Sequence, residues 1–135
     1  MKRFSFFIFV SFLCVIFFAG FIAASLVHAG SMTIAVASSD RTATAPVSNL
    51  AGRSPYYLLF DRSGKLIEVL ENPYMNARGG AGQSVVTFLA QKGVTVIVAG
   101  EFGGRMVAAM KANGIDHFEF RGTVSEAVKD VLGHK

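Results

Sequence analysis

The segment Val94–Ile115 has the sequence VTVIVAGEFGGRMVAAMKANGI, and it decides which fold the chain can adopt. Its first part, Val94–Ala99, is apolar and rich in β-branched residues, which is typical of a strand buried on both faces. Three glycines within Gly100–Gly104 predict a tight turn where the backbone can approach a ligand closely. A helix is expected from about Gly104 and ends at Gly114, which suits the left-handed position after a helix. Turns between a strand and a helix N-terminus often bind ligands in open α/β sheets.

The rest of the chain predicts further strands and helices around this unit. Thr123 and Glu126 form a capping box that opens the last helix. The expected order is therefore β-β-β-α-β-α-β-α. Right-handed crossovers make every strand except the second parallel, so we expect an α/β fold with a mixed five-stranded sheet. The other predicted strands are Met32–Ala37, Tyr56–Phe60, Leu66–Leu70 and Asp116–Arg121, and the first helix ends at about Lys92.

This topology brings three loops to the same end of the sheet. Because parallel strands end at the same edge, the loops that follow the first, third and fourth strands are expected to lie together. They contribute Arg53, Arg78 and Arg105. Two helix N-termini, which favour anions, begin beside them. The three loops are Ser38–Pro55, Asn72–Gly82 and Gly100–Gly104, and together they predict a rim that accepts an anion.

The N-terminal residues form a hydrophobic leader. Lys2 and Arg3 precede an apolar run, Phe6–Val27, which is followed by small residues typical of a signal-peptidase site. The run is longer than the roughly 7–15 residues of a signal peptide and reaches the roughly 20 that span a bilayer. Residues 1–29 are therefore interpreted as a signal peptide or an N-terminal membrane anchor, with cleavage favoured. In both cases residues 30–135 form an exported, periplasmic or extracytoplasmic domain.

Charge and cysteine usage exclude several classes of function. Removing residues 1–29 lowers the formal net charge from +4 to +2, so the basic composition gives no nucleic-acid signal. The single cysteine, Cys14, lies in the leader. The exported domain therefore has no disulfide and no thiolate ligand, which excludes all-cysteine zinc or iron–sulfur sites within one chain. Contact with a membrane is expected only through an uncleaved leader.

Five short segments occur in this order along the chain: Pro46–Ser48, Gly52–Tyr57, Glu71–Tyr74, Gly79–Gly82 and Val96–Gly103. Together they resemble the dinitrogenase iron–molybdenum cofactor biosynthesis family, which includes NifX-like proteins and the C-terminal domain of NifB. The resemblance implies a ribonuclease H-like α/β fold and a carrier of an iron–sulfur or iron–molybdenum-type cluster, with a protein partner that receives it. Two positions depart from the pattern: Leu50-Ala51 replaces a His-Phe or Arg-Phe pair, and Gly104 replaces a proline.

The candidate binding residues all lie in the three loops or directly after them. The arginines supply charge, and the glycines allow close approach of the backbone. Each has a plainer interpretation, in which the glycines only make turns and the arginines only face solvent. Met75 is preferred to Met106 as a soft ligand. Gly103→Val is expected to be harmful if Gly103 needs a positive φ. The candidates are Arg53, Met75, Arg78, Gly80, Gly82, Gly100, Glu101, Phe102, Gly103, Gly104 and Arg105.

The sequence gives little support for catalysis. A ribonuclease H-type nuclease needs several carboxylates around metal ions, and the first predicted strand carries none. His117 is expected at the end of the sheet away from the three loops. We therefore expect a non-catalytic carrier of an anionic cluster. The alternatives are an exported interaction module without a cluster and, with weaker support, an enzyme that acts on small anionic molecules.

The leader yields the first testable prediction. The domain should be found outside the cytoplasmic membrane, and N-terminal sequencing of that form distinguishes the two variants. Gly30 as the first residue indicates cleavage after Ala29, whereas an intact Met1 indicates an anchor. Recovery of the protein only from the soluble cytoplasmic fraction would contradict both variants.

Overall fold

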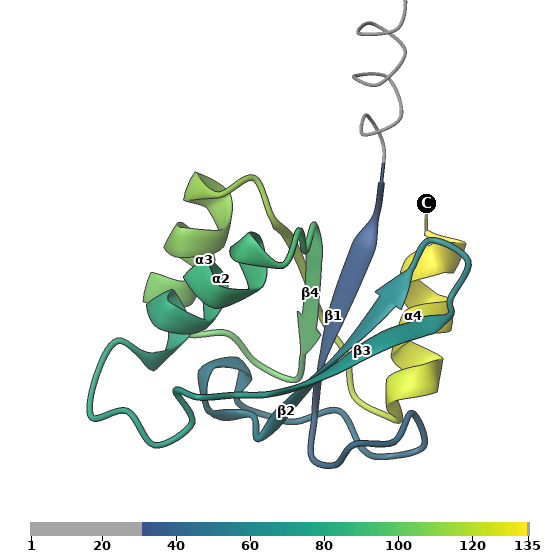
Figure 1. Ribbon diagram of the computed structural model, residues 1–135, viewed down its shortest axis with the longest axis horizontal. Helices are drawn as coiled ribbons and strands as arrows, with labels where there is room; N and C mark the ends of the chain where they lie inside the picture. The colour runs from purple at the N-terminus through teal and green to yellow at the C-terminus, as the bar shows by residue number, and fades with distance from the viewer. Residues whose placement is uncertain (1–30, 135) are drawn as a thin grey trace, which may run out of the picture. The chain divides into compact units, whose positions relative to one another are not determined.

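The computed structural model describes residues 31–134, which form a five-stranded sheet with helices on both faces (Figure 1). The predicted leader lies outside the described residues. Within 31–134, no helix is both long and apolar enough to cross a membrane. The elements are β1 (Thr33–Ser38), the 3-10 helix η1 (Ala51–Arg53), β2 (Tyr56–Asp61), β3 (Leu66–Glu71), α2 (Ala81–Gln91), β4 (Val96–Ala99), α3 (Gly104–Ala112), β5 (Asp116–Glu119) and α4 (Val124–Gly133).

The strand order is β3-β2-β1-β4-β5. β2 is antiparallel to both of its neighbours, whereas β1, β4 and β5 pair in parallel. This confirms the predicted mixed sheet in which only the second strand runs against the others. Ala35 of β1 lies between Leu59 of β2 and Ile97 of β4, and Ile97 pairs in turn with His117 of β5. The carboxyl ends of β1, β3, β4 and β5 therefore share one edge.

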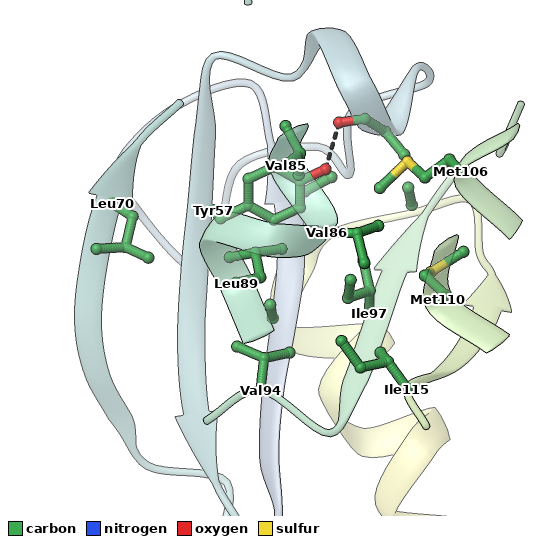
Figure 2. Close-up of a cluster of buried hydrophobic side chains, with 14 of the residues drawn as sticks. Tyr57, Leu70, Val85, Val86, Leu89, Val94, Ile97, Met106, Met110 and Ile115 are labelled. Atoms are coloured by element: carbon green, nitrogen blue, oxygen red, sulfur yellow. Dashed lines mark hydrogen bonds between the residues drawn. The ribbon is translucent and has the colours of Figure 1, made fainter. Parts of the chain in front are cut away.

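Helices cover both faces of the sheet, which explains the uninterrupted apolar runs in β1 and β4. Ala35 and Ala37 of β1 face the cluster under α2 and α3 (Figure 2). Ile34 and Val36 alternate with them and face the cluster under α4. All four side chains are fully buried. A strand with helices on both sides has no solvated face, so its pattern is continuous rather than alternating.

The predicted helix stops are confirmed, and some bounds differ. Gly93 and Gly114 have φ of 77° and 65°, as expected for the left-handed residue after a helix. The N–H of Ile115 donates back to the Met110 carbonyl at 2.9 Å. Because α2 begins at Ala81, Gly82 lies inside that helix rather than in the preceding loop.

The 38–55 loop is more regular than expected. Leu50 forms a parallel bridge with Glu101 in the Gly-rich turn, and the N–H of Ala51 donates to the Glu101 carbonyl at 3.1 Å. The N–H of Gly100 donates to the Ser48 carbonyl at 2.9 Å. The loop thus adds backbone hydrogen bonds beyond the end of β4, which hold it against the turn.

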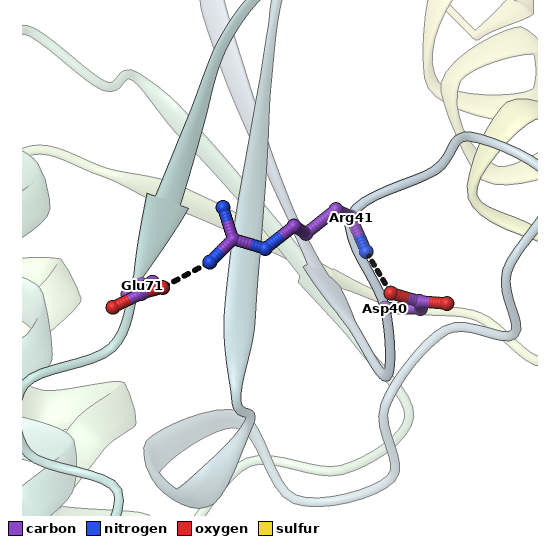
Figure 3. A network of polar contacts seen from close by, with 3 residues as sticks. All are labelled: Asp40, Arg41 and Glu71. Atoms are coloured by element: carbon purple, nitrogen blue, oxygen red, sulfur yellow. Dashed lines mark hydrogen bonds and ion pairs between the residues drawn. The ribbon is translucent and has the colours of Figure 1, made fainter.

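An exposed polar cluster connects the start of this loop to the end of β3 (Figure 3). Arg41 makes an ion pair with Glu71, and its guanidinium carbon lies 5.0 Å from the centre of the Tyr56 ring. Tyr56 and Glu71 raise the pKa of Arg41. Because solvent screens exposed ion pairs, this contact orients the loop more than it stabilises the fold.

The capping box of α4 yields a prediction about pH. The Glu126 carboxylate accepts a hydrogen bond from the Thr123 N–H at 2.9 Å, which lowers the pKa of Glu126 below its ordinary value of 4.5. A lowered folded-state pKa stabilises the fold above the ordinary value, and this contribution disappears as pH falls through the folded pKa. Glu126→Gln should therefore lower the melting temperature at pH 7 and have little effect at pH 3. Thermal melts against Glu119→Gln, an exposed control on β5, test this. An equal effect at both pH values would contradict it.

Candidate functional site

Residues of all three loops line a cleft at the carboxyl ends of the strands. Its volume is about 310 Å³, at the lower end of the range for small-molecule sites. The loops meet as the topology predicts. The lining residues come from η1 and the residue before it, the N-terminus of α2, the turn before α3 and the first turn of α3: Leu50, Ala51, Gly52, Arg53, Gly80, Ala81, Gly82, Gln83, Glu101, Gly103, Arg105 and Met106.

A larger groove of about 560 Å³ lies between α3 and β5. It is lined by residues of these two elements and of the turn that joins them, including Lys111 and His117. None of the three loops contributes to it. Volume alone therefore does not identify the candidate site, and the cleft where three chain segments converge is the better candidate.

Two glycines bring the walls of the cleft together. A Cβ atom on Gly52 would lie 2.9 Å from the backbone nitrogen of Gly82. A Cβ atom on Gly82 would lie 2.9 Å from the Cβ of Met106 in α3. Both separations are too short for real side chains. The absence of side chains at Gly52 and Gly82 thus allows η1 to pack on the backbone of α2, and the Met106 side chain of α3 to pack on the same backbone.

A buried tyrosine of the sheet holds η1 in place. Tyr57 of β2 is fully buried, and its hydroxyl donates to the Ala51 carbonyl, shown as the dashed line in Figure 2. Burial raises the pKa of Tyr57 far above its ordinary value, so the hydroxyl stays protonated and remains a donor. η1, which lines the cleft, is therefore attached to the core of the sheet.

Two buried polar side chains hold the first loop in place, and one of them, Asn72, joins it to the second loop. Asn72 donates from Nδ2 to the carbonyls of Gly52 at 3.1 Å and Ser54 at 2.9 Å, and its Oδ1 accepts from the Tyr74 N–H at 2.9 Å. The Ser54 hydroxyl lies 3.1 Å from the Ser38 carbonyl and donates to it. Each backbone group that these side chains satisfy would otherwise be costly to bury.

The charged side chains of the cleft are two arginines and one glutamate. Arg53 donates from Nη1 to the carbonyls of Met75 at 3.1 Å and Ala77 at 2.6 Å. Arg105 lies in the first turn of α3 and is exposed, as is Glu101. The lining therefore carries an excess of positive charge with one opposing carboxylate.

The two helices that open onto the cleft have no side-chain caps. Gly80 precedes α2 and Gly103 precedes α3, and neither helix has a side-chain cap hydrogen bond or an acidic residue in its first turn. By contrast, α4 has a complete capping box. The first N–H groups of a helix lack intrahelical partners, so the N–H groups of α2 and α3 are left available at the cleft.

The structure brings six of the candidate residues together and places five elsewhere. Gly100 is buried beneath Asn49, and Phe102 turns away to pack on His117 with ring centres 5.2 Å apart. The His117 ring thus reaches the Gly-rich turn, although it was expected at the opposite end of the sheet. The six in the cleft are Arg53, Gly80, Gly82, Glu101, Gly103 and Arg105, and the five outside its lining are Met75, Arg78, Gly100, Phe102 and Gly104.

Two details differ from what the sequence suggested. Met106, rather than Met75, supplies the sulfur side chain of the lining, because Gly82 leaves room for it. Gly103 has φ of −69° and ψ of 150° and open space around it. The expectation that Gly103 might need a positive φ was therefore wrong, and a side chain there meets no steric obstacle.

Sequence reasoning missed the buried polar groups that build the cleft. Ser54, Tyr57 and Asn72 all lie in segments that carry the family resemblance, so their positions contained a signal. Their partners are backbone carbonyls 2 to 20 residues away, which no local pattern reveals. Over residues 31–134, no three or more His, Cys, Asp or Glu side chains gather as they would to hold a metal ion.

The chain is similar to a known protein family and to several solved structures. A family model described as dinitrogenase iron-molybdenum cofactor matches residues 31–134. No curated protein matches the chain. Among solved structures, the apo form of the orange protein from Desulfovibrio gigas is 26% identical with a TM-score of 0.72, covering 76% of this chain and 88% of that one.

Two further structures are similar. A candidate NifB protein from Thermotoga is 30% identical with a TM-score of 0.64, covering 76% of this chain and 88% of that one. A candidate dinitrogenase from Methanocaldococcus jannaschii is 14% identical with a TM-score of 0.53, covering 78% and 91%. The last likeness concerns the fold alone.

The glycine contacts yield a prediction with a matched control. Gly82→Ala should lower the melting temperature by roughly 4 °C or more, because overpacking typically costs about 1–3 kcal/mol. Gly104→Ala, also in the first turn of a helix, adds a methyl group in open space and should leave the melting temperature unchanged or slightly raised. Thermal melts of both variants test this. Equal stability of Gly82→Ala and the parent would show that Met106 moves aside freely.

Proposed function

This chain belongs to the dinitrogenase iron-molybdenum cofactor family, and from that premise we propose that it is a non-catalytic carrier of an anionic metal cluster. The cargo is an iron–sulfur or iron–molybdenum-type cluster, or a similar anion, and it binds in the cleft of the three loops. A protein partner takes it up from there. The ribonuclease H-like assignment and export of the domain are part of the proposal. The mixed sheet with its single antiparallel strand supports the ribonuclease H-like assignment. The leader sequence of residues 1–29 supports export.

The observation that carries this proposal is the convergence of uncapped helices and arginines. The N-termini of α2 and α3 both open onto the cleft without side-chain acceptors, and Arg53 and Arg105 lie beside them. Helix N-termini and guanidinium groups both favour anions, and their effects add where they face one ligand. A neutral ligand could accept hydrogen bonds from these donors, but it would not balance their positive charge.

The donor set fits a cluster that brings its own sulfides. Residues 31–134 contain no cysteine, so no thiolate can bind a metal. The cleft offers N–H groups, two guanidinium groups, the Glu101 carboxylate and the thioether of Met106, which is the only soft donor in the lining. Binding through such groups is electrostatic and reversible, as transfer to a partner requires, and salt weakens it.

The side chains of the cleft support a non-catalytic role. Its polar side chains are Arg53, Gln83, Glu101 and Arg105. They include no hydroxyl or thiol nucleophile next to a base. His117 is not among them, because its ring packs against Phe102. An enzyme acting on small anionic molecules is accordingly the weakest alternative.

A second candidate function is an interaction module on the same fold without a cluster. Leu50 favours it, because this large apolar side chain is 54% exposed at the cleft. Leu50 and Ala51 also stand where family members often have a His or Arg followed by Phe. Titration of an anion distinguishes the two functions, since an interaction module needs no anion site.

The experiment is a titration of the full-length chain with tungstate, a simple anionic probe. Charge-assisted hydrogen bonds contribute about 1.5–3 kcal/mol each. We therefore expect Arg105→Ala to weaken binding roughly 10-fold, with an unchanged melting temperature because exposed charges contribute little to folding. Glu101→Gln should tighten binding, since it removes the opposing carboxylate.

The control is Arg62→Ala, which removes an exposed arginine from the β2–β3 hairpin at the opposite end of the sheet. It should bind tungstate like the parent. Binding should also weaken as the salt concentration rises. If Arg105→Ala and Arg62→Ala bind equally well, the cleft is not the anion site.

A further inference from the structure

The Arg53 side chain connects two parts of the cleft. Arg53 lies at the end of η1 and lines the cleft. Its Nη1 atom donates to the carbonyls of Met75 and Ala77, at 3.1 and 2.6 Å. These carbonyls belong to the loop between β3 and α2, residues 72–80, which we call the wall loop. One side chain of the first loop therefore holds the middle of the second.

The wall loop has few other attachments along its length. Its start is fixed by Asn72, and Tyr74 packs edge-on against Phe88 of α2 with ring centres 6.3 Å apart. Beyond Ala77, the residues up to the start of α2 are exposed, and a side chain on Gly79 would meet nothing within 4 Å. The Arg53 contacts are thus the last side-chain contacts before the loop joins α2.

The chemistry of guanidinium allows Arg53 to contact the loop and an anion together. Guanidinium carries five N–H donors in one rigid plane. The two hydrogens of Nη1 serve the Met75 and Ala77 carbonyls. Nη2 and Nε keep three donors on the other edges of the plane, and this side chain lines the cleft. The carbonyls hold the plane in one orientation, so those donors are positioned before an anion arrives.

We propose that Arg53 is a positioning residue that couples anion binding in the cleft to the order of the wall loop. The inference rests on the proposed function. An anion on Nη2 and Nε restrains the guanidinium plane and strengthens its hold on the loop. By reciprocity, an ordered loop raises the affinity of the cleft for the anion. The recipient of the cargo can therefore promote release by displacing the wall loop.

Arg105 provides the contrast that makes this testable. It also lines the cleft, but it projects from the first turn of α3 and has no hydrogen bond to the wall loop. Removing Arg105 should weaken anion binding and leave the wall loop as ordered as before. Removing Arg53 should affect both.

Arg78 gives a direct readout, because it is exposed in the wall loop and trypsin cleaves after arginine. The full-length chain is digested in mild detergent with and without tungstate, and cleavage of the Arg78–Gly79 bond is followed by mass spectrometry. Without tungstate, Arg53→Ala should be cleaved about 3- to 10-fold faster than the parent, since loss of hydrogen bonds to an exposed charge raises the open population by this order. Arg105→Ala and Arg62→Ala should be cleaved at the parent rate.

Saturating tungstate should slow cleavage of the parent and of Arg105→Ala but not of Arg53→Ala. Arg53→Lys keeps the charge but cannot hold two carbonyls and an anion in one plane, so its cleavage should also respond weakly. This variant decides the question if Arg53→Ala does not fold. Tungstate binding without any change in cleavage would overturn the coupling alone. No tungstate binding to the parent would overturn the proposed function and, with it, the coupling.

Discussion

The close backbone contact between Gly52 and Gly82 is the constraint on which the candidate site depends. With a Cβ atom at either position, η1 and α2, or α2 and Met106 of α3, could not approach as they do. This contact, together with the packing of Met106 on Gly82, joins segments that follow three different strands of the sheet. The fold would bring these loops to the same edge in any case, but only this packing makes them the walls of one small cleft.

Around that contact, buried and exposed polar groups have different tasks. Tyr57, Ser54 and Asn72 are buried and use their hydrogen-bonding capacity to hold the backbone. Over residues 31–134, no buried side-chain polar atom lacks a partner. The exposed Arg105 can turn toward a ligand because the backbone does not depend on it, whereas the exposed Arg53 also holds the wall loop through two carbonyls. Under the proposed function, the buried groups keep the frame rigid while the exposed arginines bind and release the anion.

The N-termini of the helices also differ: that of α4 is capped by side chains, and those of α2 and α3 are not. Thr123 and Glu126 satisfy the first N–H groups of α4, which lies on the face of the sheet opposite α2 and α3. α2 and α3 lack such caps and give up the stability that a cap contributes, typically about 1 kcal/mol. Under the function proposed for this member of the dinitrogenase iron-molybdenum cofactor family, an anionic cargo would satisfy the N–H groups that side chains leave open.

Local patterns in the sequence were enough to predict the strands and helices and the directions of the strands. The apolar run of β4, the glycines that end α2 and α3, and the Thr123 capping box act over a few residues, and connection rules then set which strands are parallel. Which side chains line the cleft could not be predicted in this way, because it depends on how distant segments pack. Phe102 turns toward His117, Met106 occupies the space beside Gly82, and Arg53 reaches the wall loop. These outcomes depend on contacts between segments about 15 to 25 residues apart, whose packing no local pattern encodes.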